Sequence, residues 1–184
     1  HNVSSAASDV YKRQIILGGI TLVRSIDEID VIKLPSPKTL EVIIIRPNIE
    51  IKTSDSRKVV KKKIKIEKMV KQSANLASFV SSLYTEDFDL MSKSVVDIIA
   101  EPNRKILIPE FDKIKKKSKN SGAIAVGISG SGPSIFSLSN NTIISKKILE
   151  TASNHYDKLG IDYDGFISKI NPTGIKILES KWNM

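Results

Sequence analysis

The chain contains no cysteine, so it forms no disulfide and offers no thiolate as a nucleophile or metal ligand. Histidine is almost as scarce: only His1 and His155 are present, and no histidine–carboxylate cluster has the spacing of a metal site. We therefore expect no metal site built from this chain alone. His155 follows a helical run, where a packing or surface role is expected rather than catalysis. The lack of cysteine is compatible with a cytoplasmic protein, which is the location we expect.

Long apolar runs and aromatic residues are also missing. The longest apolar runs are under ten residues, whereas a membrane-spanning helix needs about 20, so we expect no membrane contact. The net charge of +9 would suit a nucleic-acid partner, but only 5% of the residues are aromatic. The lysine runs 61–63 and 115–117 have almost no aromatic side chains among them to stack on bases. A solvated lysine-rich surface is the favoured interpretation, and no nucleic-acid partner is expected.

What remains is ordinary globular composition over 184 residues, with 40% hydrophobic and 27% charged residues, which indicates one domain. Helical spacing of apolar residues from Ile66 to Tyr84 predicts a long helix. A second helix is expected over 85–99 with Thr85 as its N-cap. Further helices are expected over about 109–118 and 142–158, and strands over 15–23, 40–47, 163–170 and 173–179. Together these elements predict an α+β fold, with helices packed on one face of a mostly antiparallel sheet.

The segment 127–134, GISGSGPS, is the most informative stretch, because it connects two short apolar β runs. Glycine allows positive φ and close backbone approach, and successive N–H groups there can form a nest for an anion such as phosphate. A tight glycine-rich hairpin without any ligand explains the pattern equally well. The candidate residues of this loop are Gly127, Ser129, Gly130, Ser131, Gly132 and Pro133.

Two arginines lie at expected junctions between elements, in a chain with five arginines and 24 lysines. Arg57 follows the strand 40–47 and is expected in the first turn of a helix capped by Ser54 or Asp55. Arg104 lies two residues after Pro102, in a break between helices. The planar guanidinium of such a residue can bind a carboxylate or phosphate with two hydrogen bonds. Either arginine taken alone is also explained as an ordinary surface residue.

In order along the chain, the segments LGGITLVRS, RPNIEIKTSDSRKVV, IIAEPNRKILIPEF, GISGSGPSIF and SKINPTGIKIL resemble homoserine kinases. The resemblance runs from about Ile15 to Leu178. Homoserine kinases share the glycine loop with galactokinase, mevalonate kinase and phosphomevalonate kinase, all members of the GHMP superfamily. The resemblance implies the ferredoxin-like C-terminal domain of a GHMP-type kinase over residues 15–184.

The same resemblance implies a reaction, in which the ATP γ-phosphoryl group is transferred to the hydroxyl of L-homoserine with Mg²⁺, in threonine biosynthesis. It implies that Arg57 and Arg104 bind the carboxylate of the amino acid, and that the loop 127–134 lies beside the phosphates. No catalytic residue is identified by the motifs. A homodimer is compatible with the sequence, which does not decide the oligomeric state.

The N-terminal residues depart from the family pattern. Family members carry a phosphate loop similar to GLGSSAAS well upstream of LGG, whereas SSAAS here precedes Leu17 closely and has no glycine before it. Residues 4–14 instead resemble a translated sequencing adapter, so we interpret residues 1–14 as non-native. The N-terminal ATP-loop domain would then be largely missing, and the chain itself inactive. Alternatives are another GHMP small-molecule kinase, a non-catalytic amino-acid-binding domain or, least favoured, a nucleic-acid-binding domain.

Overall fold

The computed structural model describes residues 15–25 and 30–176, and the interpretation of residues 1–14 lies outside them. The chain divides into two compact units. One comprises His1–Lys38 together with Ile170–Met184, and the other comprises Thr39–Lys169.

The first unit contains a two-stranded antiparallel sheet of β1 (Ile20–Val23) and β2 (Val31–Leu34), in which Ile20 lies opposite Leu34. The expectation of a strand from residue 15 was wrong, because residues 15–17 are helical and Gly18 and Gly19 follow with φ of +63° and +73°. A Cβ on Gly18 would lie 2.1 Å from the Gly174 nitrogen, so only glycine fits this backbone contact. β2 was not predicted.

The prediction of a second closing strand over 173–179 is also wrong for the residues of this range that the structure describes. Residues 173–176 form a turn and an irregular segment, and residues 177–179 lie outside the described residues. Asn171, just before this turn, accepts a hydrogen bond from the Gly19 N–H at 2.7 Å through its backbone carbonyl. The Asn171 carbonyl is therefore satisfied by a single contact with a residue distant in sequence and not by a strand ladder.

The second unit is built on a four-stranded sheet of β3 (Glu41–Pro47), β4 (Ala125–Ile128), β5 (Ile135–Ser139) and β6 (Tyr163–Lys169). The spatial order is β4-β5-β3-β6, and all three pairings are antiparallel. With helices between β3 and β4 and between β5 and β6, this is the split β-α-β arrangement of ferredoxin-like folds. The predicted α+β class and the antiparallel sheet are confirmed.

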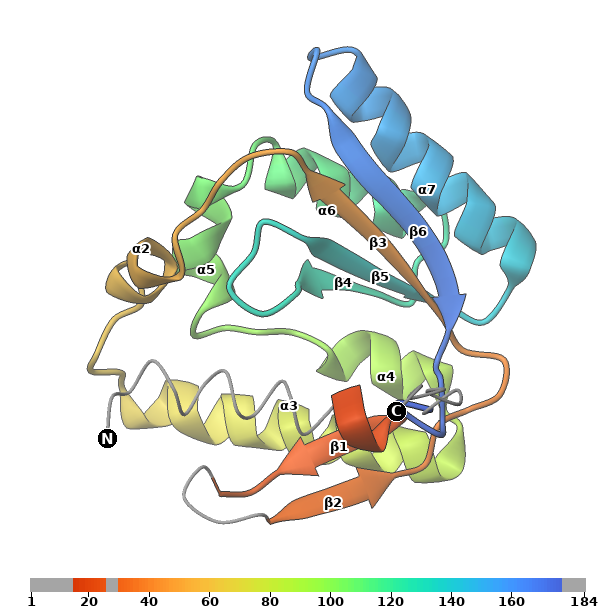
Figure 1. The fold of residues 1–184 in the computed structure, drawn as a ribbon. Helices are drawn as coiled ribbons and strands as arrows, with labels where there is room; N and C mark the ends of the chain where they lie inside the picture. The colour runs from red at the N-terminus through yellow and green to blue at the C-terminus, as the bar shows by residue number, and fades with distance from the viewer. Residues whose placement is uncertain (1–14, 26–29, 177–184) are drawn as a thin grey trace, which may run out of the picture. The chain divides into compact units, whose positions relative to one another are not determined.

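Six helices accompany this sheet in the described residues: α2 (Thr53–Lys58), α3 (Ile66–Thr85), α4 (Phe88–Ser94), α5 (Glu101–Arg104), α6 (Phe111–Asn120) and α7 (Thr142–Asp157). Helices α6 and α7 pack on the sheet, whereas α3 and α4 pair with each other below it in the view of Figure 1. The core lies between the sheet and α6 and α7, and includes Ile43, Ile45, Phe111, Ile135, Ile148 and Tyr156.

The expected helix over 85–99 is shorter than predicted. Thr85 ends α3, Glu86 adopts a left-handed conformation with φ of 52°, and α4 begins at Phe88. Its N-cap is Asp87, whose side chain accepts a hydrogen bond from the Leu90 N–H at 2.8 Å. A carboxylate one residue before the helix competes well for the free N–H groups, so the cap lies two residues later than predicted.

The apolar side of α3 is largely exposed. Leu83 is buried, but five of the predicted apolar positions are at least 47% exposed: Ile66, Met69, Val70, Leu76 and Tyr84. The predicted helix is confirmed, while the burial expected from its periodicity is found only near its C-terminal end. No helix in the described parts of the chain is both long and apolar enough to cross a membrane.

Candidate functional site

The glycine loop is the connection of the β4–β5 hairpin and points toward α2 and α5 (Figure 1). Gly130 and Gly132 have φ of +60° and +81°, as the sequence suggested for these positions. The loop closes on itself through two hydrogen bonds, from the Ser129 N–H to the Ser134 carbonyl at 2.8 Å and from the Gly132 N–H to the Ser129 carbonyl at 3.0 Å. Gly127 lies earlier, within β4, and the Gly132–Pro133 peptide bond is cis.

Gly132 also lies against the core. A Cβ at this position would come within 3.1 Å of Ile108 Cδ1 and 3.4 Å of Ile128 Cγ2. A side chain is therefore disfavoured twice, by the positive φ and by the lack of space. The second half of the loop is fixed by this contact as well as by its own hydrogen bonds.

Arg104 lies next to the glycine loop. Its Nη1 donates a hydrogen bond to the Gly130 carbonyl at 3.0 Å, and its Nε donates to the Ser56 carbonyl in α2 at 3.3 Å. Arg104 lies between α4 and α6, as predicted, but this junction is itself helical. It ends α5 and precedes a 3₁₀ turn, Lys105–Leu107.

Arg57 is adjacent in sequence to Ser56 and half-buried. The expectation that it lies in the first turn of its helix was wrong: α2 begins at Thr53 with Lys52 as N-cap, so Arg57 lies in the last turn. Within the described parts of the chain, the Arg57 guanidinium has no hydrogen-bond or ion-pair partner. The structure thus brings the segment of Arg57, Arg104 and the loop together through Ser56.

Ser56 and Asp97 complete this arrangement, and neither was predicted. The fully buried Ser56 donates its hydroxyl hydrogen to the Ser131 carbonyl at 2.7 Å. Asp97 accepts hydrogen bonds from the N–H groups of Ile99 and Ala100 at 2.8 Å and of Glu101, the first residue of α5, at 3.1 Å, so it holds the turn that leads into α5. An aspartate ahead of a helical turn is a recognisable capping pattern, whereas no local pattern marks a buried serine as a tertiary contact.

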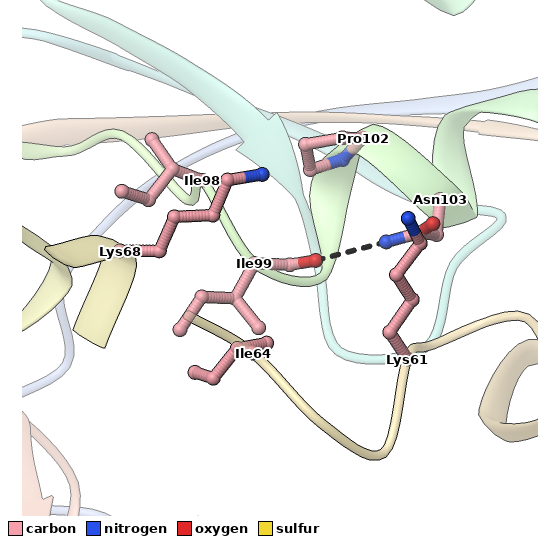
Figure 2. Close-up of a pocket in the computed structure, with 7 residues that line it drawn as sticks. All are labelled: Lys61, Ile64, Lys68, Ile98, Ile99, Pro102 and Asn103. Atoms are coloured by element: carbon pink, nitrogen blue, oxygen red, sulfur yellow. Dashed lines mark hydrogen bonds between the residues drawn. The ribbon is translucent and has the colours of Figure 1, made fainter. Parts of the chain in front are cut away.

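A pocket of about 110 Å³ opens on another side of α5. Figure 2 shows the side chains of Lys61 and Lys68 reaching toward Pro102 and Asn103. Three isoleucines, Ile64, Ile98 and Ile99, supply apolar lining. Its wall is held by hydrogen bonds from the Asn103 amide to the Ile99 carbonyl at 3.0 Å and from the Ile98 N–H to Gln72 Oε1 at 3.0 Å.

Several ionisable groups away from the glycine loop contact neighbouring side chains of the protein. His155 is buried, as the packing interpretation expected, with Nδ1 3.0 Å from Lys117 Nζ and Nε2 3.4 Å from Glu110 Oε2. A hydrogen bond from Lys113 is the main cause that lowers the pKa of Glu110. Burial lowers the pKa of Lys119, whose ammonium group donates to Ser92 Oγ at 3.1 Å. Among the described residues, no group of three or more histidine and carboxylate side chains is arranged to hold a metal ion.

Comparison with known proteins identifies the family to which this arrangement is similar. Residues 79–158 match the family described as GHMP kinases C terminal. A homoserine kinase from Chlorobium phaeobacteroides strain BS1 is 35% identical over 165 residues, covering 89% of this chain and 52% of the relative. One from Buchnera aphidicola subsp. Schizaphis graminum is 39% identical over 140 residues, covering 76% of this chain and 45% of the relative.

Solved structures agree with these relatives. A homoserine kinase from Cytophaga hutchinsonii superposes with a TM-score of 0.85 at 40% identity, covering 88% of this chain and 51% of that chain. A phosphomevalonate kinase from Streptococcus pneumoniae, at 17% identity and a TM-score of 0.58, shares the fold. The chain spans about half the length of the curated relatives that it matches. It has the fold of a GHMP kinase C-terminal domain and is a homologue of homoserine kinases over most of its length.

Proposed function

We propose that this chain supplies the C-terminal part of a homoserine kinase. The observation that carries the proposal is the 35–40% identity to homoserine kinases from Chlorobium and Cytophaga over 88–89% of the chain. In the proposed reaction the hydroxyl oxygen of L-homoserine bonds to the γ-phosphorus of ATP. The bond from that phosphorus to the bridging oxygen breaks with its electron pair on the oxygen of ADP, and the hydroxyl proton passes to water.

Arg57 and Arg104 are the residues proposed to bind the homoserine carboxylate. The Arg57 guanidinium, which has no partner within the described residues, supports this role, because a carboxylate can take two of its hydrogen bonds in a matching plane. Arg104 has five N–H groups and donates two of them to protein carbonyls, which leaves three for a ligand. Phosphoryl transfer depends mainly on positioning and charge neutralisation, so such contacts can contribute much of the catalysis.

The glycine loop is the part of this chain proposed to lie beside the ATP phosphates. Among the described residues, no acceptor is hydrogen-bonded to the N–H groups of Gly130 and Ser131, which suits an anion at this point. The residues present do not fit a Mg²⁺ site, since the described chain offers no cluster of carboxylates. We assign no step of the reaction to Mg²⁺ on this chain. A cytoplasmic location remains an expectation of the same proposal, with which a homodimer is compatible.

The test is a coupled ATP assay of the whole protein with a panel of acceptors: L-homoserine, mevalonate and phosphomevalonate. Phosphorylation of homoserine alone supports the proposal, and preference for mevalonate or phosphomevalonate would replace it with the related kinase. Calorimetry that detects an amino acid bound without nucleotide, in a protein with no kinase activity, would favour a binding domain. Assayed by itself, the 184-residue chain is expected to be inactive, because the relatives with this name are about twice as long.

The role of Arg57 has its own test in the same assay. Arg57→Met removes the guanidinium and is expected to raise the KM for homoserine by about 10- to 100-fold, as for a lost charged hydrogen bond. The KM for ATP should change little. Lys58→Met, which removes the neighbouring exposed charge, is the matched control. Equal effects of the two substitutions would show that general charge, and not a carboxylate contact, is being measured.

A further inference from the structure

The two arginines of the candidate site differ in what they already contact. Arg57 has no side-chain partner among the described residues, whereas Arg104 donates to carbonyls of two separate segments. One of these, Gly130, belongs to the glycine loop, and the other, Ser56, belongs to α2. A single side chain from α5 therefore joins the loop to α2 without any ligand.

The loop and α2 are also joined directly. The Ser56 hydroxyl donates to the carbonyl of Ser131, so two consecutive loop carbonyls, those of Gly130 and Ser131, accept hydrogen bonds from outside the loop. Ser56 is fully buried, so water cannot readily replace its hydroxyl as the donor to Ser131. The two carbonyls are thereby turned toward α2 and α5.

The short helix α5, which carries Arg104, is held in place by several contacts. Asp97 accepts three hydrogen bonds from the turn that leads into α5, the last of them from Glu101, the first residue of α5. Glu101 of α5 forms an ion pair with Lys115 of α6, and both side chains are largely buried. These contacts fix α5 and thereby the Arg104 guanidinium. Its hydrogen bond to the Gly130 carbonyl in turn fixes the position of Gly130.

We propose that Arg104, in addition to the ligand contact proposed for its remaining N–H groups, is a positioning residue, which holds the glycine loop in place before any ligand binds, whereas Arg57 has no such role. The consequence for catalysis rests on the proposed function, but the effect on the loop does not. An arginine that served only to bind a substrate would leave the ligand-free loop unchanged when it was replaced.

The experiment measures amide hydrogen exchange by NMR in the ligand-free 184-residue chain. The reporters are the N–H groups of Ser129 and Gly132, whose hydrogen bonds close the loop. Arg104→Met is expected to speed their exchange by about 10- to 100-fold, the range for a lost hydrogen bond from a charged donor. Arg104→Lys keeps the charge but lacks the planar fork, so it is expected to restore only part of the protection.

Two controls keep the result interpretable. Arg57→Met removes a guanidinium one residue from Ser56 and should leave both reporters within about twofold of the original chain. The N–H groups of Ile124 and Asn48, which bond to the Leu138 and Asp162 carbonyls at 2.8 and 2.7 Å, report whether the sheet and its surroundings stay folded. Their protection should persist in every variant.

Unchanged exchange at Ser129 and Gly132 in Arg104→Met would overturn the proposal, as would an equal acceleration in Arg57→Met. Loss of protection at Ile124 and Asn48 as well would mean that Arg104 supports the whole fold and not the loop, which also contradicts it. None of these outcomes depends on homoserine. A failure of the kinase assay and a failure of the loop assignment are therefore separate results.

Discussion

At the scale of single residues, Gly132 shows how backbone conformation and packing act together. Its φ of +81° suits glycine, and a Cβ would meet Ile108 Cδ1 at 3.1 Å. Gly160 shares the first property but not the second, with φ of +64° and nothing within 4 Å of a built Cβ. Comparing substitutions at these two glycines therefore separates the cost of the left-handed conformation from the cost of crowding.

Gly132→Ala is expected to lower the free energy of unfolding by about 2 kcal/mol or more, because strain and crowding add. Gly160→Ala should lower it by about 1 kcal/mol, because only the left-handed conformation is penalised. Urea denaturation followed by circular dichroism measures both values. Equal losses would mean that Ile108 and Ile128 move aside at little cost.

There is a physical reason why some of these residues were predicted from the sequence and others were missed. Gly130 and Gly132 were recognised because glycine in a short hairpin carries a local conformational signal. Ser56 was missed because its hydroxyl bonds to a residue 75 positions away, and no local pattern reports such a contact. Arg57 was predicted as a candidate binding residue, but it was placed in the first turn of its helix and lies in the last turn of α2.

At the scale of elements, the helix caps decide where the chain changes direction. Asn141 is the N-cap of α7, and its side chain accepts hydrogen bonds from the N–H groups of Ile143 and Ile144 at 2.9 and 3.1 Å. Helix α7 packs on the sheet that carries the glycine loop. A loose first turn would therefore weaken the layer beneath the loop.

Asn141→Ala is expected to lower the free energy of unfolding by about 1 kcal/mol, because two helix N–H groups lose their acceptor. The exposed neighbour Asn140 offers the matched control, and Asn140→Ala should stay within about 0.5 kcal/mol of the original chain. Thermal or urea denaturation compares the two variants directly. Indistinguishable stabilities would show that water replaces the cap without loss.

At the scale of the whole molecule, stability should depend on the buried carboxylate of Glu41. The nearby hydroxyls of Ser145 and Thr142 lower the pKa of Glu41 below its ordinary value of 4.5, and that of Thr142 donates to Glu41 Oε1 at 2.8 Å. Glu41 also lies opposite Lys169 across β3 and β6. The charged form is therefore favoured in the folded chain, and the resulting stability is present above pH 4.5 and lost as the pH falls through the lowered pKa.

Glu41→Gln is expected to lower the melting temperature near neutral pH, because the charged acceptor is lost. As the pH falls below 4.5 and through the lowered pKa of Glu41, the original chain protonates Glu41 as well, so the difference between the two proteins should shrink. Differential scanning calorimetry across about pH 3 to 7 measures this difference. A difference that stayed constant with pH would contradict the assignment.

The sequence by itself determined the α+β class, the long helix over α3, the hairpin around the glycine loop and the resemblance to homoserine kinases. These follow from local periodicity, glycine positions and ordered motifs, which are properties of neighbouring residues. Only the tertiary structure decided that Arg104 and Ser56 meet the carbonyls of Gly130 and Ser131, and that the apolar side of α3 stays exposed. Those contacts join residues up to 75 positions apart, and burial depends on which elements pack together, so no local pattern can encode them.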